Sequence, residues 1–390
     1  MHILMMPSWY PETAADFSGS FFREQAEALA AAGHTVGVLA VRGFAIYQLA
    51  ALRARPSGVR SAHESGVAVL RRDVLLPVPK AEGLKLKLLE RAWLDLYERY
   101  EREHGTPDVL HAHTMLPAGL IAARISRRTG VPFVVTEHRP SVAAQVGSGA
   151  TRRRALAAAR DAGALVAVST GFADALNAAY DTNRWQAVPG LLSPQLEGAA
   201  VRPVPTSRFV FGHVSHLDEG KRVDQLIDAF ADAFGTDGAP DEASAPILRI
   251  VGDSPERAAL EARAAGSPAA GLIEFVGAVP RERITDEFAG FSAFVLTSDA
   301  ETFGTVFWEA MALGIPVIAS DTWGGRGAAR PDTGILVPVG DRAALTAALI
   351  ELRERFDAFD AAHIRARSIE HCGRAVFVNN YVEVYRKAGS

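Results

Sequence analysis

The sequence predicts an α/β protein made of two doubly wound domains, each a parallel sheet covered by helices on both faces. With 390 residues, the chain is too long for one ordinary core, and roughly two or three domains are expected. In both halves, short apolar strand patterns alternate with helical patterns, as in parallel sheets. Between the halves, residues 189–207 are rich in proline, glycine and small residues and lack periodicity. We therefore expect domains at 1–190 and 208–370, a linker at 191–207, and a C-terminal helix at 371–390.

The first half contains a series of strand patterns separated by alanine-rich helices. Helices are expected at 21–33 and 117–130, and Gly130 fits the left-handed position that often follows a helix. The strand candidates, in chain order, are HILMM, TVGVLAV, VAVLRR, DVLHAH, PFVVTEH, ALVAVS and QAVPG. This order predicts a parallel sheet with crossover helices.

The second half follows the same scheme without repeating the sequence of the first. Its strand candidates are RFVFGHVSHL, ILRIVGD, IEFVGAV, AFVLTSD, PVIASD and GILVPVG. The polar stretch at 236–246 is expected to be a surface loop of this domain. The two halves thus share an architecture but no sequence repeat.

Composition and charge exclude several classes of protein. The chain is 48% hydrophobic and 22% charged, which is typical of a soluble globular protein. No apolar run approaches the roughly 18 residues of a membrane span, and no signal peptide is expected. The single cysteine, Cys372, excludes an internal disulfide and a cysteine-ligated metal site, and indicates a reducing cytoplasm.

The charge is unevenly distributed along the chain. Residues 1–200 carry four more basic than acidic residues, and residues 201–390 carry eight more acidic than basic residues. Neither half is basic enough for a nucleic-acid partner.

Unusual polar residues and a glycine follow the predicted strands. Ligands of doubly wound sheets bind beyond the carboxyl ends of the strands, so residues at these positions are candidates for a binding site. In the first half they are Gly19, His111, His113, Glu137 and His138; in the second half they are Lys221 and Glu301.

The stretch AETFGTVFWEA carries two glutamates on one predicted helical segment. Glu301 precedes the helix and Glu309 lies about two turns along, so their carboxylates should be roughly 10 Å apart or more. That separation is too large for a shared proton and wide for the paired acids of a glycosidase. The backbone N–H groups of Thr302, Gly304 and Thr305 would form an anion site at the helix start. The spacing therefore fits a nucleotide-sugar, which presents a sugar, a diphosphate and a ribose in this order.

These residues resemble a known family. The segment SDAETFGTVFWEAMALGIPVIASD is similar to the donor-binding signature of retaining glycosyltransferase family four, which has the GT-B fold. The similarity extends over SGSFFREQAEALAAAGHTVGVLAV, DVLHAHTMLPAGLIAARISRRTGVPFVVTEH, HVSHLDEGKRVDQLIDAF and GILVPVGD, in the family's order. The resemblance implies two Rossmann-like domains with a cleft between them, and a last helix that crosses back to the first domain.

The resemblance also implies roles for the donor-binding residues. Lys221 would neutralise the donor diphosphate, and Glu301 would accept hydrogen bonds from hydroxyls of the transferred sugar. Glu309 would bind the ribose. The backbone of Phe303, Gly304 and Thr305 would lie beside the donor. These roles agree with the general preference of carboxylates for hydroxyl groups and of cations for a leaving diphosphate.

Further roles concern the acceptor and the reaction. Gly19 would let backbone N–H groups approach the diphosphate and the acceptor, and His113 would lie near the reacting centre. Glu137 and His138 are expected to contact the acceptor. The implied reaction transfers a sugar, with retained anomeric configuration, from a nucleotide-sugar to a saccharide or lipid-linked acceptor. UDP is favoured as the nucleotide, and neither a cofactor nor a protein-bound metal is expected.

Two positions depart from the family. The arginine that usually precedes the lysine by five residues is His216 here, which is expected to contact the diphosphate. An imidazole is only partly charged near neutrality, so either the diphosphate is held less tightly, or Arg222 or His213 compensates. The asparagine that usually follows the Val-Pro pair of the linker region is Gly190.

Other interpretations remain open. The helical stripe of residues 83–103 indicates either a core-packed helix or, with Lys80, Lys85, Lys87 and Arg91 at its start, contact with an anionic membrane surface. Arg152, Arg153 and Arg154 would extend such a patch. Alternative functions are another GT-B enzyme, such as a nucleotide-sugar epimerase or a sugar phosphorylase, and a non-catalytic sugar-nucleotide-binding subunit. A dinucleotide dehydrogenase is disfavoured because no G-x-G-x-x-G follows the first strand.

Overall fold

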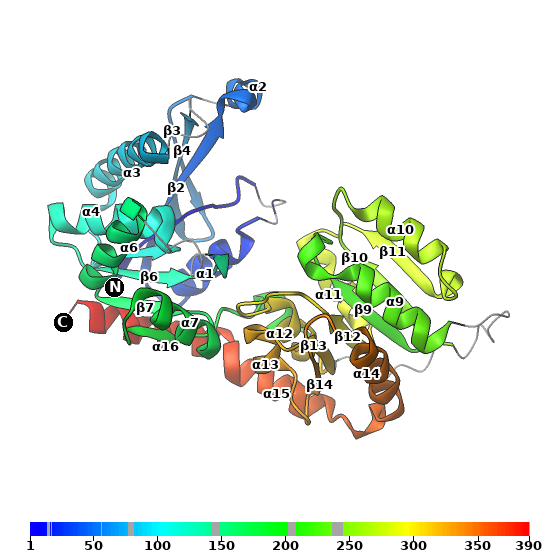
Figure 1. Ribbon diagram of the computed structural model, residues 1–390. Helices are drawn as coiled ribbons and strands as arrows, with labels where there is room; N and C mark the ends of the chain where they lie inside the picture. The colour runs from blue at the N-terminus through cyan, green and yellow to red at the C-terminus, as the bar shows by residue number, and fades with distance from the viewer. Residues whose placement is uncertain are drawn as a thin grey trace. The chain divides into compact units, whose positions relative to one another are not determined.

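The computed structural model describes residues 1–13, 16, 18–55, 57–76, 82–141, 149–201, 208–235 and 245–389. Backbone contacts divide the chain into two units (Figure 1). The front unit comprises Met1–Val188 and Phe377–Ser390, and the back unit comprises Pro189–Val376. Each unit is a predominantly parallel sheet covered by helices. The predicted α/β class is therefore confirmed.

The front unit is built on a sheet with the strand order β3-β4-β2-β1-β5-β6-β7-β8. Its strands are β1 (His2–Pro7), β2 (Thr35–Ala45), β3 (Val59–Glu64), β4 (Val67–Leu76), β5 (Val109–His113), β6 (Phe133–Glu137), β7 (Ala164–Ala167) and β8 (Trp185–Ala187). All neighbouring pairs are parallel except β3 and β4. The strand β3, which no sequence pattern predicted, pairs with β4 across a tight turn at Ser65 and Gly66, both with positive φ.

Helices cover both faces of this sheet. They are α1 (Ser20–Ala31), α2 (Leu49–Arg53), α3 (Glu82–His104), α4 (Leu120–Thr129), α6 (Gly149–Asp161), α7 (Thr170–Tyr180) and the final helix α16 (Arg374–Ala388). The predicted helix at 117–130 begins later, because Met115–Gly119 form a wider helical turn. Gly130 follows α4 with φ 79°, as predicted.

The apolar stripe of α3 packs against the core. Trp93, Tyr97 and Tyr100 are almost completely buried, which supports the core-packing interpretation of this helix. Lys87 and Arg91 are exposed, whereas Lys80 lies outside the described residues.

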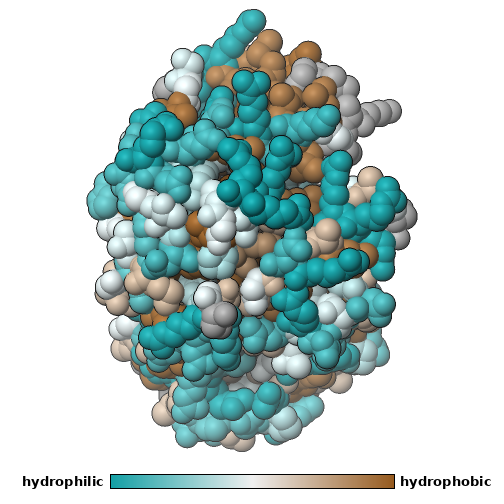
Figure 2. Space-filling view, turned by 90° about the vertical axis from the view of Figure 1, so that its left-hand side faces the viewer, coloured by the Kyte–Doolittle hydropathy of each residue, from teal (hydrophilic) through white to brown (hydrophobic). Residues whose placement is uncertain are grey.

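Figure 2 shows a face dominated by hydrophilic residues, with apolar residues gathered near its top, at the height of α2.

The back unit contains a sheet with the strand order β11-β10-β9-β12-β13-β14, and all its neighbouring pairs are parallel. The strands are β9 (Val210–Val214), β10 (Ile247–Val251), β11 (Ile273–Gly277), β12 (Ala293–Leu296), β13 (Val317–Ser320) and β14 (Gly334–Val337). The helices are α8 (Pro194–Gly198), α9 (Val223–Phe234), α10 (Arg257–Ala265), α11 (Ile284–Ala289), α12 (Thr305–Ala312), α13 (Trp323–Ala328), α14 (Arg342–Glu354) and α15 (Ala361–Cys372). A core cluster joins the sheet to α9 and α14.

The expected linker differs from the structure, whereas the expected C-terminal helix is present. Of the predicted linker, residues 191–201 are described, and they include α8 and the buried Leu191, Leu192 and Leu196. The backbone N–H of Leu192 also donates to the Cys372 carbonyl. This segment packs into the back unit because its leucines are buried there. The predicted C-terminal helix at 371–390 corresponds to α16, which begins at Arg374 because α15 extends to Cys372, and the residues from Phe377 onward belong to the front unit as expected.

The described residues contain no helix that is both long and apolar enough to cross a membrane.

Candidate active site

The carboxyl ends of β9 and β12, which are neighbouring strands, bring Lys221 and Glu301 together. The Lys221 ammonium donates to the Glu301 carboxylate at 2.5 Å. The Ser298 hydroxyl donates to the same oxygen at 3.0 Å. The two loops are also joined by their backbones, because Asp299 N–H donates to the Gly220 carbonyl at 2.8 Å. Two residues 80 positions apart in the sequence are thus held as one partly exposed ion pair.

A glycine shapes the turn between Glu301 and α12. Gly304 precedes the helix with φ 66°, a left-handed conformation that favours glycine. A Cβ atom at this position would lie 2.5 Å from the ring of Phe307. Beside it, Phe303 is buried and Thr305 is partly exposed. The glycine therefore permits both the turn and the close packing at the helix start.

Glu309 is buried and paired with a residue that the sequence analysis missed. Its side chain is 1% exposed, and the Arg281 guanidinium donates to it at 2.5 Å. Arg281 begins a short helical turn, Arg281–Arg283, after β11. The only sequence signal was a charged run, PRER, beyond a predicted strand. A buried carboxylate requires such a partner because an isolated buried charge is costly.

His213 does not compensate for the missing arginine. It is fully buried; its Nδ1–H donates to the Val295 carbonyl at 2.9 Å, and its Nε2 accepts from the Ser215 hydroxyl at 2.7 Å. Burial lowers the pKa of His213 to about 4, and the nearby Lys221 charge adds to this effect. A neutral imidazole cannot neutralise a diphosphate, so this alternative is wrong.

The other two residues near the missing arginine remain candidates. His216 is exposed in the loop after β9. Arg222 lies at φ 50° and pairs with Asp224 and Asp299. Two carboxylates therefore compete with any anionic ligand for the Arg222 guanidinium, whereas His216 is open to solvent.

Packing explains the second departure from the family. Gly190 lies against the ring of Phe303, and a Cβ atom at position 190 would be 3.1 Å from that ring. The ring would have to shift by a few tenths of an ångström to admit even a Cβ atom at this position. Glycine at this position thus matches the placement of Phe303 beside Glu301.

In the front unit, Gly19 begins α1 and packs against Trp9. It has φ 81°, and a Cβ atom there would lie 3.0 Å from the Trp9 ring. The Trp9 ring contacts Phe22 edge-on, with a centroid distance of 5.0 Å, and Phe22 lies 4.7 Å from the ring of His113. Gly19 therefore serves a turn and a close contact beside the predicted site.

His113 and His138 meet at the ends of β5 and β6. His113 Nδ1 and His138 Nε2 form a hydrogen bond of 3.1 Å. His113 is fully buried, and its Nε2 has no hydrogen-bond partner within the described part of the chain. Burial, and then the neighbouring His111 and His138, hold the pKa of His113 well below 6.5. His113 is therefore a neutral imidazole with one uncommitted ring nitrogen.

His111 is part of a buried hydrogen-bond network with α16. Its Nδ1 bonds to the Tyr385 hydroxyl and its Nε2 to the Thr136 hydroxyl, both at 2.8 Å. The Thr136 hydroxyl also bonds to the Tyr381 hydroxyl at 3.1 Å. Burial lowers the pKa of His111 to about 3. The ring of His111 lies 4.0 Å from that of His113, so the last helix supports the edge of the sheet that carries both histidines.

Glu137 serves the fold. It is fully buried, and its carboxylate accepts hydrogen bonds from the backbone N–H groups of Met115, His138 and Arg139 at 2.8–3.0 Å. Burial raises its pKa, and these bonds oppose that rise. With both oxygens engaged and no exposed surface, Glu137 does not fit the predicted acceptor contact. His138 keeps some exposure.

Within the described ranges, no group of three or more histidine, cysteine, aspartate and glutamate side chains is arranged to hold a metal ion.

Two parallel sheets, with the Lys221–Glu301 pair and the start of α12 at the carboxyl edge of the second, are the arrangement expected of a glycosyltransferase of the GT-B fold. Family models support the same class. Residues 18–189 match the model described as "Glycosyl transferase 4-like domain", and residues 198–358 match "Glycosyl transferases group 1". The chain belongs to the family-four type of glycosyltransferases, as the sequence motifs predicted.

Curated relatives have the same class of activity. The chain is 31% identical over 248 residues to a GDP-mannose-dependent alpha-mannosyltransferase of Mycobacterium tuberculosis, and this match covers 60% of the chain and 61% of that protein. It is 26% identical over 346 residues to TuaC of Bacillus subtilis, a putative teichuronic acid biosynthesis glycosyltransferase, with 83% and 82% covered.

Solved structures share the fold. Sucrose-phosphate synthase from Thermosynechococcus elongatus superposes with a TM-score of 0.77 at 20% identity, covering 99% of both chains. HepE from Anabaena, solved in complex with UDP, gives a TM-score of 0.72 at 20% identity and covers 99% of this chain and 100% of that one. At this identity the likeness concerns the fold alone.

Proposed function

We propose that this protein is a retaining, hexosyltransferase-type glycosyltransferase that moves a sugar from a nucleotide-sugar to a saccharide or lipid-linked saccharide in polysaccharide or glycolipid biosynthesis. The observation that carries the proposal is the Lys221–Glu301 ion pair at the carboxyl edge of the back sheet. A cation next to a hydroxyl-binding carboxylate suits the junction between a diphosphate and its sugar. Helix α12, which has Gly304 as its N-cap residue, begins four residues after Glu301.

Donor binding would exchange the partners of this ion pair. The Lys221 ammonium would turn to the diphosphate, and the Glu301 carboxylate would accept hydrogen bonds from sugar hydroxyls. The backbone N–H groups at the start of α12 would stabilise negative charge as it develops on the leaving phosphate. Two charges that neutralise each other would thus be redirected to complementary parts of one donor.

In the proposed reaction, the bond between the anomeric carbon and the diphosphate oxygen breaks while the acceptor oxygen bonds to the same face of the sugar. The leaving phosphate oxygen would take the proton of the acceptor hydroxyl, so no strong protein base is required. His113 is neutral and has one uncommitted ring nitrogen. It would hydrogen-bond to the reacting groups without adding a charge.

Glu309 would contact the ribose while it remains paired with Arg281. The Arg281 guanidinium holds the carboxylate in place through a hydrogen bond, and a carboxylate is a good acceptor for ribose hydroxyls. His216, which is exposed, would approach the diphosphate from the loop after β9. Arg281 would act on the donor only through Glu309.

The donor is proposed to be UDP-linked, and the reaction to need neither a cofactor nor a protein-bound metal. Structures of HepE with UDP and with UDP-glucose support UDP, whereas the mannosyltransferase relative uses GDP-mannose by its name. TuaC, by its name, acts in teichuronic acid biosynthesis, which supports a polysaccharide pathway. We also propose a cytoplasmic location, with peripheral membrane contact through the basic start of α3.

Two alternatives make different predictions. A nucleotide-sugar epimerase would convert the donor without an acceptor, and a non-catalytic subunit would bind the donor without converting it.

Thermal unfolding with UDP-, GDP- and ADP-linked sugars would identify the donor, because a ligand at 100 times its Kd stabilises the folded protein by about 2.7 kcal/mol. Incubating that donor with saccharide acceptors should then yield a product with the donor's anomeric configuration. Donor binding without any transfer or epimerisation would contradict an enzymatic role.

A further inference from the structure

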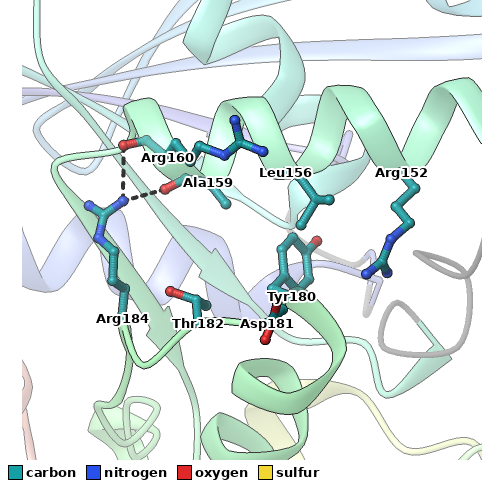
Figure 3. A pocket seen from close by; sticks show the side chains of 8 residues that line it. All are labelled: Arg152, Leu156, Ala159, Arg160, Tyr180, Asp181, Thr182 and Arg184. Carbon is teal, nitrogen blue, oxygen red and sulfur yellow. Dashed lines mark hydrogen bonds between the residues drawn. The ribbon is translucent and has the colours of Figure 1, made fainter.

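We propose that a cavity in the front unit, separate from the candidate active site, binds a phosphate group. It has a volume of about 200 Å³, enough for several water molecules at about 30 Å³ each. Its walls come from α6, from the end of α7 and from the chain between α7 and β8 (Figure 3). The lining residues are Arg152, Leu156, Ala159, Arg160, Tyr180, Asp181, Thr182 and Arg184.

This cavity is separate from the candidate active site. Arg184 directly precedes β8, and the backbone carbonyl of Ala162, which it contacts, lies just before β7. The cavity therefore extends along the amino ends of these strands. His113 and His138 lie at the carboxyl ends of β5 and β6 in the same sheet, and ligands of the transfer reaction bind at that edge.

The lining carries an excess of positive charge. The lining residues include three arginines and one acidic residue, Asp181. Arg160 and Arg184 form no ion pair with any carboxylate in the part of the chain that the structure describes, whereas Arg127 and Arg128 of the neighbouring α4 each pair with an acid. Arginine side chains recognise phosphate through their planar set of N–H donors. A cavity of this size, with Arg160 and Arg184 free of ion pairs to any described carboxylate, therefore favours a phosphate-sized anion.

Backbone contacts hold one of the guanidinium groups in place. Arg184 donates to the carbonyls of Ala159 and Arg160 at 2.6 and 3.0 Å, and to that of Ala162. These bonds cap the end of α6, yet they use only part of the five N–H donors of a guanidinium. A cation that is already immobilised loses less entropy when it binds an anion.

The remaining lining suits the rest of a phosphorylated molecule. Leu156, Ala159 and the ring of Tyr180 provide an apolar wall, and Thr182 provides a hydroxyl (Figure 3). The Tyr180 hydroxyl is buried and has no hydrogen-bond partner among the described residues; in Figure 3 it points toward α6, on the side of Arg152. The ligand class that fits is a phosphomonoester, either a soluble one or a lipid headgroup.

The test measures the affinity of the full chain for inorganic phosphate by ³¹P NMR titration. Arg160→Gln should weaken binding by about tenfold or more, as expected for loss of a charge-assisted contact. The matched control is Arg153→Gln, an exposed arginine on the same helix outside the cavity, which should change the Kd by less than about twofold. Asp181→Asn should tighten binding by about two- to fivefold, and asparagine is well tolerated at the positive φ of this residue, 53°.

A second experiment separates the two sources of phosphate. Vesicles of phosphatidylcholine with and without phosphatidic acid are tested for binding to the native chain and to the Arg160→Gln variant. Binding that needs both phosphatidic acid and Arg160 supports a lipid headgroup, and Arg160-dependent binding of inorganic phosphate without vesicle binding supports a soluble ligand. The proposal is overturned if Arg160→Gln and Arg153→Gln weaken phosphate binding equally, or if neither does.

Discussion

The carboxyl edges of the two sheets use polar residues in opposite ways. In the front unit, burial keeps His111, His113 and His138 neutral by lowering their pKa values. His113 and His138 form a hydrogen bond with each other, and His111 bonds to two hydroxyl groups. In the back unit, opposite charges stand in pairs, Lys221 with Glu301 and Arg281 with Glu309. A neutral edge offers hydrogen bonds without attracting ions, whereas an ionic edge can redirect its charges to a charged ligand.

This difference agrees with the proposed division of labour. A donor brings a diphosphate, whose charge must be balanced by cations and N–H groups. An acceptor brings hydroxyls, which a neutral imidazole can meet while the leaving phosphate takes the proton. The comparison therefore predicts that changes in charge matter most in the back unit, and that changes in pH reach both units through their buried histidines.

The largest effect on stability should follow from breaking the buried pair in the back unit. Arg281→Ala would leave the Glu309 carboxylate, 1% exposed, without its partner, and should lower the free energy of unfolding by about 3–5 kcal/mol. The control is Arg283→Ala, which removes an exposed arginine from the same turn. Chemical denaturation measures both. Adding Glu309→Gln to Arg281→Ala should recover part of the loss. Equal stability of the two single variants would show that the pair is not needed to keep Glu309 buried.

Acidification should destabilise both units through histidines that are buried in the neutral form. The pKa values of His213 and His111 fall to about 4 and about 3, below the value of about 6.5 in the unfolded chain. The unfolded state therefore binds more protons below pH 6.5, and stability falls as the pH falls from 6.5 toward 4. Each such histidine contributes a slope of about 1.4 kcal/mol per pH unit in this range.

Variants can assign these slopes. His213→Gln and His111→Gln should each reduce the pH dependence of the unfolding free energy by about 1.4 kcal/mol per pH unit between roughly pH 6 and 4.5. The slope is the readout, because glutamine also loses hydrogen bonds but does not titrate. An unchanged slope in either variant would mean that the substituted histidine is protonated in the folded protein. For His111→Gln, the description of the front-unit edge as neutral would then fail.

The sequence predicted those features that depend on periodicity and on local motifs. Strand patterns gave the two parallel sheets, and the Phe-Gly pair after Glu301 located the start of α12. Partners from distant segments were missed. Arg281 is 28 positions from Glu309, and no local pattern links them. Likewise, Tyr385 reaches His111 across 274 positions.

Other errors arose where packing overrides local preference. The stretch after Pro189 has the composition of a linker, but its leucines are buried in the back unit. Glu137 ends a strand, where a binding residue is expected. Its carboxylate instead accepts hydrogen bonds from three backbone N–H groups in the interior. His213, which lay near the expected diphosphate contacts, is held neutral by burial. Composition and position alone do not reveal which side chains are buried.

The most direct test of the central claim is calorimetric titration of free UDP against two variants of the back-unit ion pair. Lys221→Ala removes the cation proposed to bind the diphosphate and should weaken UDP by about 10- to 100-fold, as expected for loss of a contact of about 1.5–3 kcal/mol. Glu301→Gln removes the carboxylate that competes for Lys221, while UDP lacks the sugar that Glu301 would bind. UDP affinity in Glu301→Gln should therefore be unchanged or higher, and Lys87→Ala, an exposed lysine of the front unit, should match the native chain. Equal weakening of UDP by Lys221→Ala and Glu301→Gln would contradict the account.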